Sequence, residues 1–104
     1  MPVVKADAPA QTTTNGWVDL NDSLMQVAFG GLFSYILQCT DQDSKYKILA
    51  SNDKTNWFEE TPEQDIAKDA TKEEAGPAYY LYYKVQIKEG ATPGGKVAAQ
   101  GVAK

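Results

Sequence analysis

The stretch Tyr79-Tyr80-Leu81-Tyr82-Tyr83-Lys84-Val85-Gln86-Ile87-Lys88 decides the fold of this chain. Read with a period of two, one face carries Tyr79, Leu81, Tyr83, Val85 and Ile87. The opposite face carries Tyr80, Tyr82, Lys84, Gln86 and Lys88. Such alternation, in a stretch rich in aromatic and β-branched residues, predicts a half-buried strand. In a chain of 104 residues we expect a central strand, with Leu81, Tyr83, Val85 and Ile87 buried beneath other strands.

Shorter stretches of the same kind occur along the rest of the chain. They cover residues 16–20, 24–29, 33–40, 45–51 and 96–104, and Trp57-Phe58 starts a further short strand or cover. The single cysteine, Cys39, lies in one of them and is expected to be a buried small hydrophobe. Gly101 is expected to mark a bulge in the last. Six or seven short strands separated by polar turns predict an all-β fold, an antiparallel β-sandwich.

The segment from Thr61 to Gly76 is ambiguous. Thr61-Pro62-Glu63-Gln64 has the form of a helix start, and Gly76-Pro77 has the form of a helix stop. The apolar content between them is Ile66 and scattered alanines, too little for the apolar stripe of a long helix. We expect irregular cover with one or two helical turns, and the choice between helix and loop over 62–75 stays open.

Residues 1–15 are predicted to form an extended N-terminal arm, and residues 16–104 the sandwich domain. The arm contains Pro2, Pro9, alternating alanines and a polar run, and so has little to bury. Ordering a backbone costs about 1–2 kcal/mol per residue. Contacts with a partner surface must therefore offset this cost of ordering, for example if the partner accepts the arm as an added strand. We expect Pro2 to Gln11 to contact another chain and to make few contacts with their own domain.

The composition argues against several classes of function. The chain has no histidine and no arginine, and its ten basic residues are all lysines. The usual acid–base catalyst, the commonest metal ligand and the bidentate phosphate contact are thus absent. A net charge of -4 without charge blocks argues against nucleic-acid binding. We expect no membrane span and no signal peptide, because no apolar run approaches ~18 residues and the first residues lack a basic segment before an apolar one.

Two acidic stretches of the sequence resemble a metal site and a catalytic site. Asp41-Gln42-Asp43 has the spacing that opens a calcium loop, but Tyr46 and Asn52 stand where such a loop needs glycine and an acidic residue. The carboxylates between Glu59 and Asp65 predict a solvated acidic edge, since catalytic carboxylates need a buried partner with a raised pKa. We therefore expect no metal, no cofactor, no catalytic residue and no enzymatic activity.

The tyrosines of the central stretch have two interpretations. Tyr80 and Tyr82, with Lys84, would form an exposed aromatic stripe suited to sugar stacking or to a protein interface. The alternative is a strand covered on both faces, and the sequence leaves this choice open. Trp17 and Trp57 are expected in the core or at its rim.

The order Tyr46-Lys47-Ile48-Leu49-Ala50-Ser51-Asn52-Asp53-Lys54-Thr55-Asn56-Trp57, followed by Tyr83-Lys84-Val85-Gln86-Ile87-Lys88, resembles a known pattern. It is similar to the strand–S-x-D-G-T-N-W–strand signature of discoidin-like jelly-roll domains, which also occurs in many small bacteriophage virion β-proteins. The resemblance covers roughly residues 45–104. Lys54 stands where the pattern prefers glycine, and Lys84 and Lys88 replace its late arginines. The resemblance implies a jelly-roll sandwich and, among the virion relatives, a capsid decoration or auxiliary protein.

We therefore expect a structural virion protein that cements a capsid through its surface and its arm. The expected partners are the major capsid protein, other virion proteins or further copies of the chain, with no nucleic acid and no membrane. The expected location is the capsid surface, after synthesis in the host cytoplasm. The residues expected to bind the partner are Val3, Val4, Lys5, Pro9, Tyr80 and Tyr82. The alternative is a carbohydrate-binding module that stacks a sugar on Tyr80, Tyr82 or Trp57.

Overall fold

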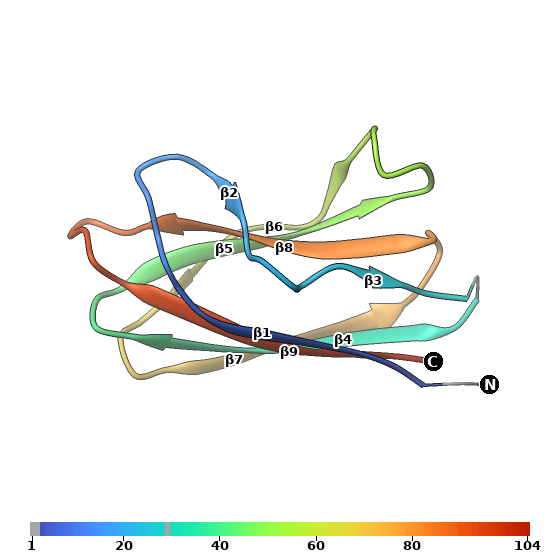
Figure 1. Cartoon of the computed structure of the whole chain (residues 1–104), viewed down its shortest axis with the longest axis horizontal. Helices are drawn as coiled ribbons and strands as arrows, with labels where there is room; N and C mark the ends of the chain where they lie inside the picture. Colours follow the sequence, from blue (N-terminus) through green and yellow to red (C-terminus); the bar gives the residue numbers. More distant parts are fainter. Residues whose placement is uncertain (1–2, 29) are drawn as a thin grey trace.

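The structure, a computed structural model, describes residues 3–28 and 30–104, so Pro2 of the predicted arm lies outside the described residues. Within these residues, nine strands form two antiparallel sheets packed face to face (Figure 1). Sheet A has the order β1-β9-β4-β7, and sheet B has the order β2-β8-β5-β6 with β3 also paired to β8. The strands are β1 (Val4–Thr12), β2 (Val18–Asp19), β3 (Met25–Gln26), β4 (Leu32–Thr40), β5 (Ser44–Ser51), β6 (Phe58–Ile66), β7 (Thr71–Pro77), β8 (Tyr82–Glu89) and β9 (Lys96–Ala103).

Strands β2 and β3 are two pieces of one interrupted edge. Both pair with β8, β2 through Val18 opposite Ile87 and β3 through Met25 opposite Tyr83. The turn between them has Asp22 in the left-handed region, at φ 66°. Counted as one strand, they give two four-stranded sheets in which the first strand lies beside the last, the arrangement of an eight-stranded jelly roll. The predicted all-β antiparallel sandwich of jelly-roll type is confirmed.

The central strand is β8, as its alternation predicts. Its buried side chains are Tyr83, Val85 and Ile87, each 0% exposed. The prediction for Leu81 was wrong, since this side chain is 37% exposed. The strand begins only at Tyr82, and the Leu81 N–H donates to Asn52 Oδ1 in the neighbouring loop. The alternation in the sequence therefore begins before residue 82, where the strand itself begins.

Gly101 does not mark a bulge. The register of β9 is continuous through Gly101 against both β1 and β4. A Cβ at this position would lie 2.7 Å from Tyr35 Cε1 and 2.8 Å from Met25 Sδ. Both neighbours are buried between the sheets, as is Cys39, in agreement with the sequence. Glycine at position 101 is thus a packing requirement at the centre of the core.

The segment predicted as irregular cover with helical turns is two strands. Strand β6 pairs with β5, and β7 pairs with β4, so the chain crosses from sheet B to sheet A near Asp69. Pro62 lies where the register of β6 against β5 shifts by a bulge. An edge strand tolerates proline at such a place, because no ladder hydrogen bond is needed there. The local helix signals were outweighed by pairing with distant strands.

The predicted arm is a strand of the domain itself. From Val4 to Thr12 it pairs with β9, and Ala6 and Ala8 are buried in the core. The expectation of few contacts with its own domain was wrong, because backbone pairing orders a strand whose side chains are small. A bulge between Ala8 and Gln11, which includes Pro9, interrupts the free edge of β1. Since proline and bulges disfavour further pairing along an edge, β1 is poorly suited to act as a strand added to a partner.

Candidate docking face

The outer face of sheet A is the candidate docking face. Its central strands, β4 and β9, present only uncharged side chains between Leu32 and Thr40 and between Ala98 and Val102. Three of these are exposed large hydrophobic residues: Leu32 at 56%, Ile36 at 43% and Val102 at 38%. Charged side chains lie around this centre: Lys5, Asp7 and Glu73 on the edge strands β1 and β7, and Lys96 at the start of β9. An uncharged centre inside a charged rim is the anatomy of a protein–protein interface.

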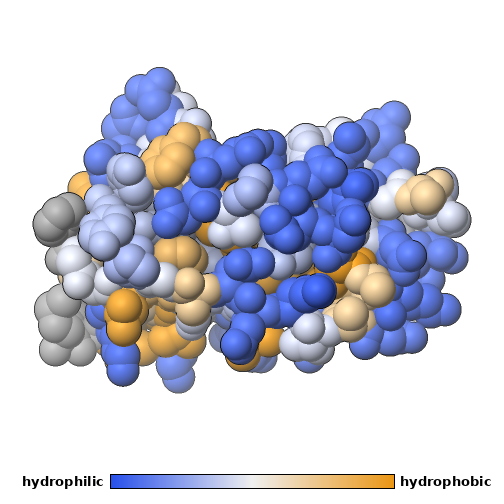
Figure 2. Space-filling model, turned by 180° about the vertical axis from the view of Figure 1, so that it is seen from behind, coloured by the Kyte–Doolittle hydropathy of each residue, from blue (hydrophilic) through white to orange (hydrophobic). Residues whose placement is uncertain are grey.

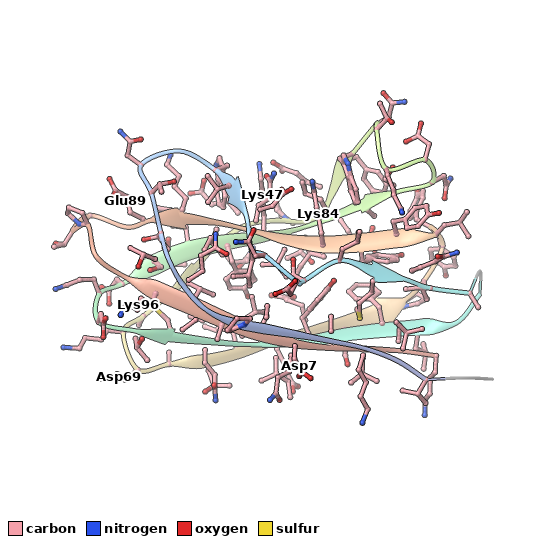
Figure 3. All side chains as sticks on the ribbon, viewed as in Figure 1. Asp7, Lys47, Asp69, Lys84, Glu89 and Lys96 are labelled. Atoms are coloured by element: carbon pink, nitrogen blue, oxygen red, sulfur yellow. The ribbon has the colours of Figure 1, made fainter. Side chains whose placement is uncertain are left out.

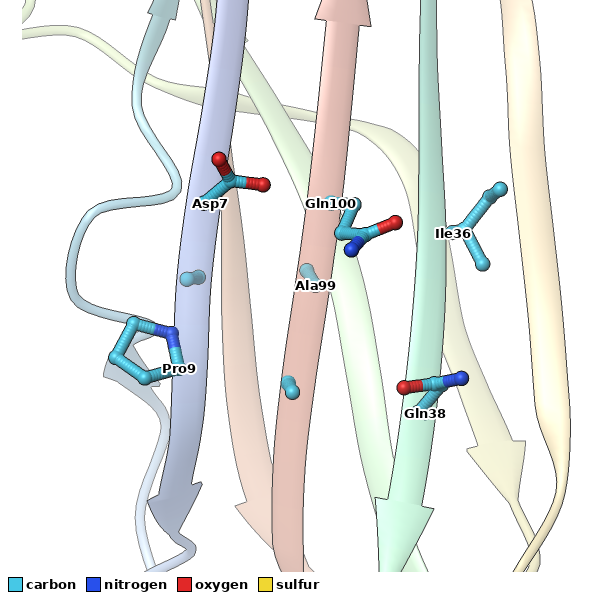
Figure 4. Close-up of a pocket in the computed structure, with 8 residues that line it drawn as sticks. Asp7, Pro9, Ile36, Gln38, Ala99 and Gln100 are labelled. Atoms are coloured by element: carbon cyan, nitrogen blue, oxygen red, sulfur yellow. The ribbon is translucent and has the colours of Figure 1, made fainter.

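Two shallow hollows lie on the docking face. The larger, about 530 Å³, is lined by Asp7, Ala8, Pro9, Ile36, Gln38, Ala98, Ala99 and Gln100 (Figure 4). The small side chain of Ala98 leaves this space open. Ala98 pairs with Gln38 on one side and faces the β1 bulge on the other. The second hollow, about 210 Å³, lies between Leu32, Ala75 and Val102. The face therefore has relief into which side chains of a partner would fit.

The outer face of sheet B has a different character, because three of the four lysines that β5 and β8 present there are paired with carboxylates. Lys45 contacts Glu63 and Asp65, Lys47 contacts Glu59, and Lys84 contacts Asp19. The side chains of Lys47 and Lys84 project from sheet B away from sheet A, whereas Asp7 lies on the opposite side of the molecule (Figure 3).

The two tryptophans also contact lysines on the outer face of sheet B. The Lys47 ammonium lies 4.5 Å from the centroid of Trp17, and the Lys84 ammonium lies 4.3 Å from that of Trp57. Burial alone would raise the pKa of Asp19, but hydrogen bonds from Gln86 and Lys84, together with the charge of Lys84, lower it below its ordinary value. The charged groups of Lys47, Lys84 and Asp19 on sheet B thus have partners within the chain.

The residues predicted to bind a partner fall into two separate places. Lys5 and Pro9 lie exposed on the outer side of β1, at the rim of the docking face. Val3 is exposed beside them, and Val4 is half-buried against the core. Tyr80 and Tyr82 belong instead to the side of sheet B.

Tyr80 and Tyr82 do not form a continuous exposed stripe. Both are half-buried. Tyr80 meets Phe58 edge-on with ring centroids 4.5 Å apart, and the Lys54 ammonium lies 4.9 Å from the centroid of Tyr82. The interpretation of β8 as a strand covered on both faces is nearer to the structure than an open aromatic stripe.

Hydrogen bonds within the loop of residues 51–57 explain most residues of its motif. The Asp53 carboxylate accepts hydrogen bonds from the N–H groups of Thr55 and Asn56, from the Asn56 side chain and from the Ser51 hydroxyl. Trp57 Nε1 donates to the Lys54 carbonyl oxygen. Lys54 is in the left-handed region at φ 64°, which explains why the pattern that this loop resembles prefers glycine there.

Replacing Asp53 by asparagine should remove a pH-dependent part of the stability. The hydrogen bonds from Asn56, Thr55 and Ser51 hold the folded-state pKa of Asp53 well below its unfolded value of about 3.9. The contribution is therefore complete above about pH 4 and is lost as the pH falls through the folded-state pKa. We expect Asp53→Asn to melt below the wild type near neutral pH and the two melting temperatures to converge on acidification. A gap that does not change with pH would contradict this role.

The sequence did not single out the apolar centre of the docking face. Ile36 falls on the polar side of its own strand, between Ser34 and Gln38. A β-branched apolar residue on a polar strand face was the available sign of an exposed apolar surface. Val102 is a similar case on the outer face of β9. Seen from behind, the molecule is largely hydrophilic, with hydrophobic side chains more frequent in its lower half, the side of sheet A (Figure 2). The described residues contain no helix that is long and apolar enough to span a bilayer.

Comparison with known proteins identifies the fold. No protein-family model matches the chain, and no curated protein matches its sequence. The SPBc2 prophage-derived protein YomS is similar in structure, with a TM-score of 0.69, 7% identity and coverage of 98% of this chain and 92% of YomS. A chain from the disulfide-linked pili of Bacillus endospore appendages has a TM-score of 0.62, 10% identity and coverage of 97% and 86%.

A chain of the T13 viral particle of IBDV is also similar. Its TM-score is 0.59 at 8% identity, and the match covers 98% of this chain but 30% of the IBDV chain. At such identities these likenesses establish a shared β-sandwich and nothing about activity.

Proposed function

We propose that this chain is a structural protein of a virus particle and that it docks on the capsid, as a decoration or auxiliary protein, through the outer face of sheet A. The observation that carries the proposal is the uncharged, partly apolar centre formed by β4 and β9. Surfaces of soluble proteins rarely expose such an apolar centre unless it is an interaction site, and on the other sheet most lysines are paired with carboxylates of the same chain. Two structural neighbours support the choice of particle, since one is prophage-derived and another belongs to a viral particle.

The overall dimensions of the chain set an upper limit on the area of the docking face. The chain measures 40 × 24 × 18 Å, and its two sheets are stacked across the 24 Å direction in Figure 1. These dimensions include the loops, so the face covers at most 40 Å by 18 Å, or about 720 Å², somewhat less than the ~800 Å² that each partner contributes to a standard interface. Burial of its apolar part would stabilise the contact by about 25 cal/mol per Å² before the costs of association.

The cementing contact proposed here involves a rigid face in place of a free arm. Lys5 and Pro9 take part as rim residues, because β1 is fixed to β9. The partner is the major capsid protein or another virion protein, and the location is the surface of the particle. The mechanism requires neither catalysis nor a cofactor.

A charge-neutral double substitution tests the proposal. Ile36 pairs with Glu73, and Val102 pairs with Lys5. Ile36→Lys with Val102→Glu therefore gives each new charge an opposite cross-strand neighbour and keeps the net charge at -4. We expect an unchanged fold and at least tenfold weaker co-sedimentation with particles of the virus whose genome encodes the chain, since charges at an interface centre are costly to desolvate.

The matched control introduces the same charges elsewhere. Leu24→Glu with Leu81→Lys changes two exposed apolar residues outside the docking face, at 47% and 37% exposure. This control should co-sediment as the wild type does. Equal co-sedimentation of the docking-face variant and the wild type would refute the proposed face, and failure of the unmodified chain to bind particles would refute the virion role.

A further inference from the structure

A small hollow at the end of sheet B combines an aromatic corner with amide groups. It measures about 190 Å³ and is lined by Ser51, Asn52, Asp53, Asn56, Phe58 and Tyr80. Phe58 is 40% exposed and meets Tyr80 at an interplanar angle of 67°, so the two rings form the walls of a corner. The loop of residues 51–57, the start of β6 at Phe58 and the segment before β8 bring these groups together.

The amides beside the corner have hydrogen-bonding groups to spare. Asn52 uses its Oδ1 to accept from Leu81 N–H, and within the described residues its two amide protons have no acceptor. Asn56 uses its Nδ2 to donate to Asp53 Oδ2, and its Oδ1 receives no hydrogen bond from the described part of the chain. The hollow therefore offers adjacent donors and an acceptor next to an aromatic surface.

The hollow favours an uncharged ligand. The Asp53 carboxylate is occupied by hydrogen bonds from its own loop. The Lys54 ammonium is turned to Tyr82. A pyranose ring has one apolar C–H face, which packs on an aromatic ring, and vicinal hydroxyls, each of which both donates and accepts.

We propose that this hollow binds the terminal pyranose ring of a neutral saccharide. Phe58 and Tyr80 would hold the C–H face of the sugar, and Asn52 and Asn56 would hold two neighbouring hydroxyls. The volume limits the ligand to one ring, since pockets for larger organic ligands measure about 300–1,000 Å³. The site is distinct from the docking face and does not depend on the proposed function.

The experiment is an amide NMR titration of the full chain with methyl glucopyranoside, methyl galactopyranoside and methyl mannopyranoside. We expect at least one of them to shift the Asn52 side-chain amide and the Leu81 N–H, and to leave the amides of Ile36 and Val102 in place. Phe58→Ala should weaken binding about tenfold, because one aromatic stacking contact is worth about that factor. Absence of shifts with all three glycosides would overturn the proposal.

Two further variants make the result specific. Asn52→Asp retains an oxygen that accepts from Leu81 N–H but removes the two free donors, so it should keep the fold and lose most of the affinity. Ile36→Lys with Val102→Glu should bind the glycoside as the wild type does. Binding that survives both Phe58→Ala and Asn52→Asp would show that the sugar sits elsewhere and would equally refute this site.

Discussion

A chain that lacks residues 1–12 is expected to lose its cooperative fold. Strand β1 forms seven residue pairs with β9, from Val4 opposite Ala103 to Thr12 opposite Lys96. Without it, the backbone groups of β9 on that side lose their partners, and the core loses the cover of Ala6 and Ala8. Small domains are stable by only about 5–15 kcal/mol. The loss of a whole strand should therefore leave the chain largely unfolded at 25 °C.

Amide NMR dispersion and a thermal melt followed by circular dichroism would measure this effect. Addition of a synthetic peptide of residues 3–13 should restore the dispersed spectrum, because the missing strand can add to the free edge of β9 in trans. A truncated chain with the melting temperature of the full chain would instead support the free arm that the composition suggested. The peptide separates a lost strand from general damage by truncation.

Gly101→Val is expected to be the most damaging single substitution in β9. Its side chain would enter the space of Tyr35 Cε1 and Met25 Sδ, which lie 2.7 and 2.8 Å from an ideal Cβ. The Tyr35 ring is held in place, because its hydroxyl shares its one proton between the carbonyl oxygens of Ser23, at 2.6 Å, and Tyr83, at 3.0 Å. Overpacking of a rigid core costs about 3 kcal/mol. The melting temperature should then fall by about 12–24 °C for a domain of this size.

Two controls define the cause of that loss. Gly16→Ala places a Cβ in open space and should change the melting temperature little. Combining Gly101→Ala with Met25→Ala should cost less than the sum of the two single changes, since the second frees the space that the first requires. Strict additivity, or a Gly101→Val chain as stable as the wild type, would contradict the close packing.

Several features of this protein follow from local sequence. The alternation of β4, β5 and β8 correctly assigns the core side chains, among them Tyr35, Ile48 and Val85. The reason is that side chains in a strand alternate strictly between its two faces, so the apolar face must turn inward. Most of the loop of residues 51–57 is equally local, because the hydrogen bonds of Ser51, Asp53 and Trp57 connect residues at most three apart.

Other features arise only from tertiary pairing. The segment 4–12 has little apolar content, and the segment 61–76 carries helix signals, yet both are strands because β9, β5 and β4 supply backbone partners from distant parts of the chain. Every residue except proline carries the same backbone donor and acceptor, so the pattern of side chains does not show which strands pair. The candidate docking face has the same origin.

Ile36 and Val102 are single apolar residues on polar strand faces, separated by most of the sequence. They become diagonal neighbours only when β4 pairs with β9. The sequence alone thus determined which side chains of β4, β5 and β8 fill the core of this sandwich and how most of its 51–57 loop is built. The tertiary structure decided which strands lie at the edges, where the chain crosses between sheets and which outer face has an uncharged centre, because each of these depends on pairing between residues far apart in the chain.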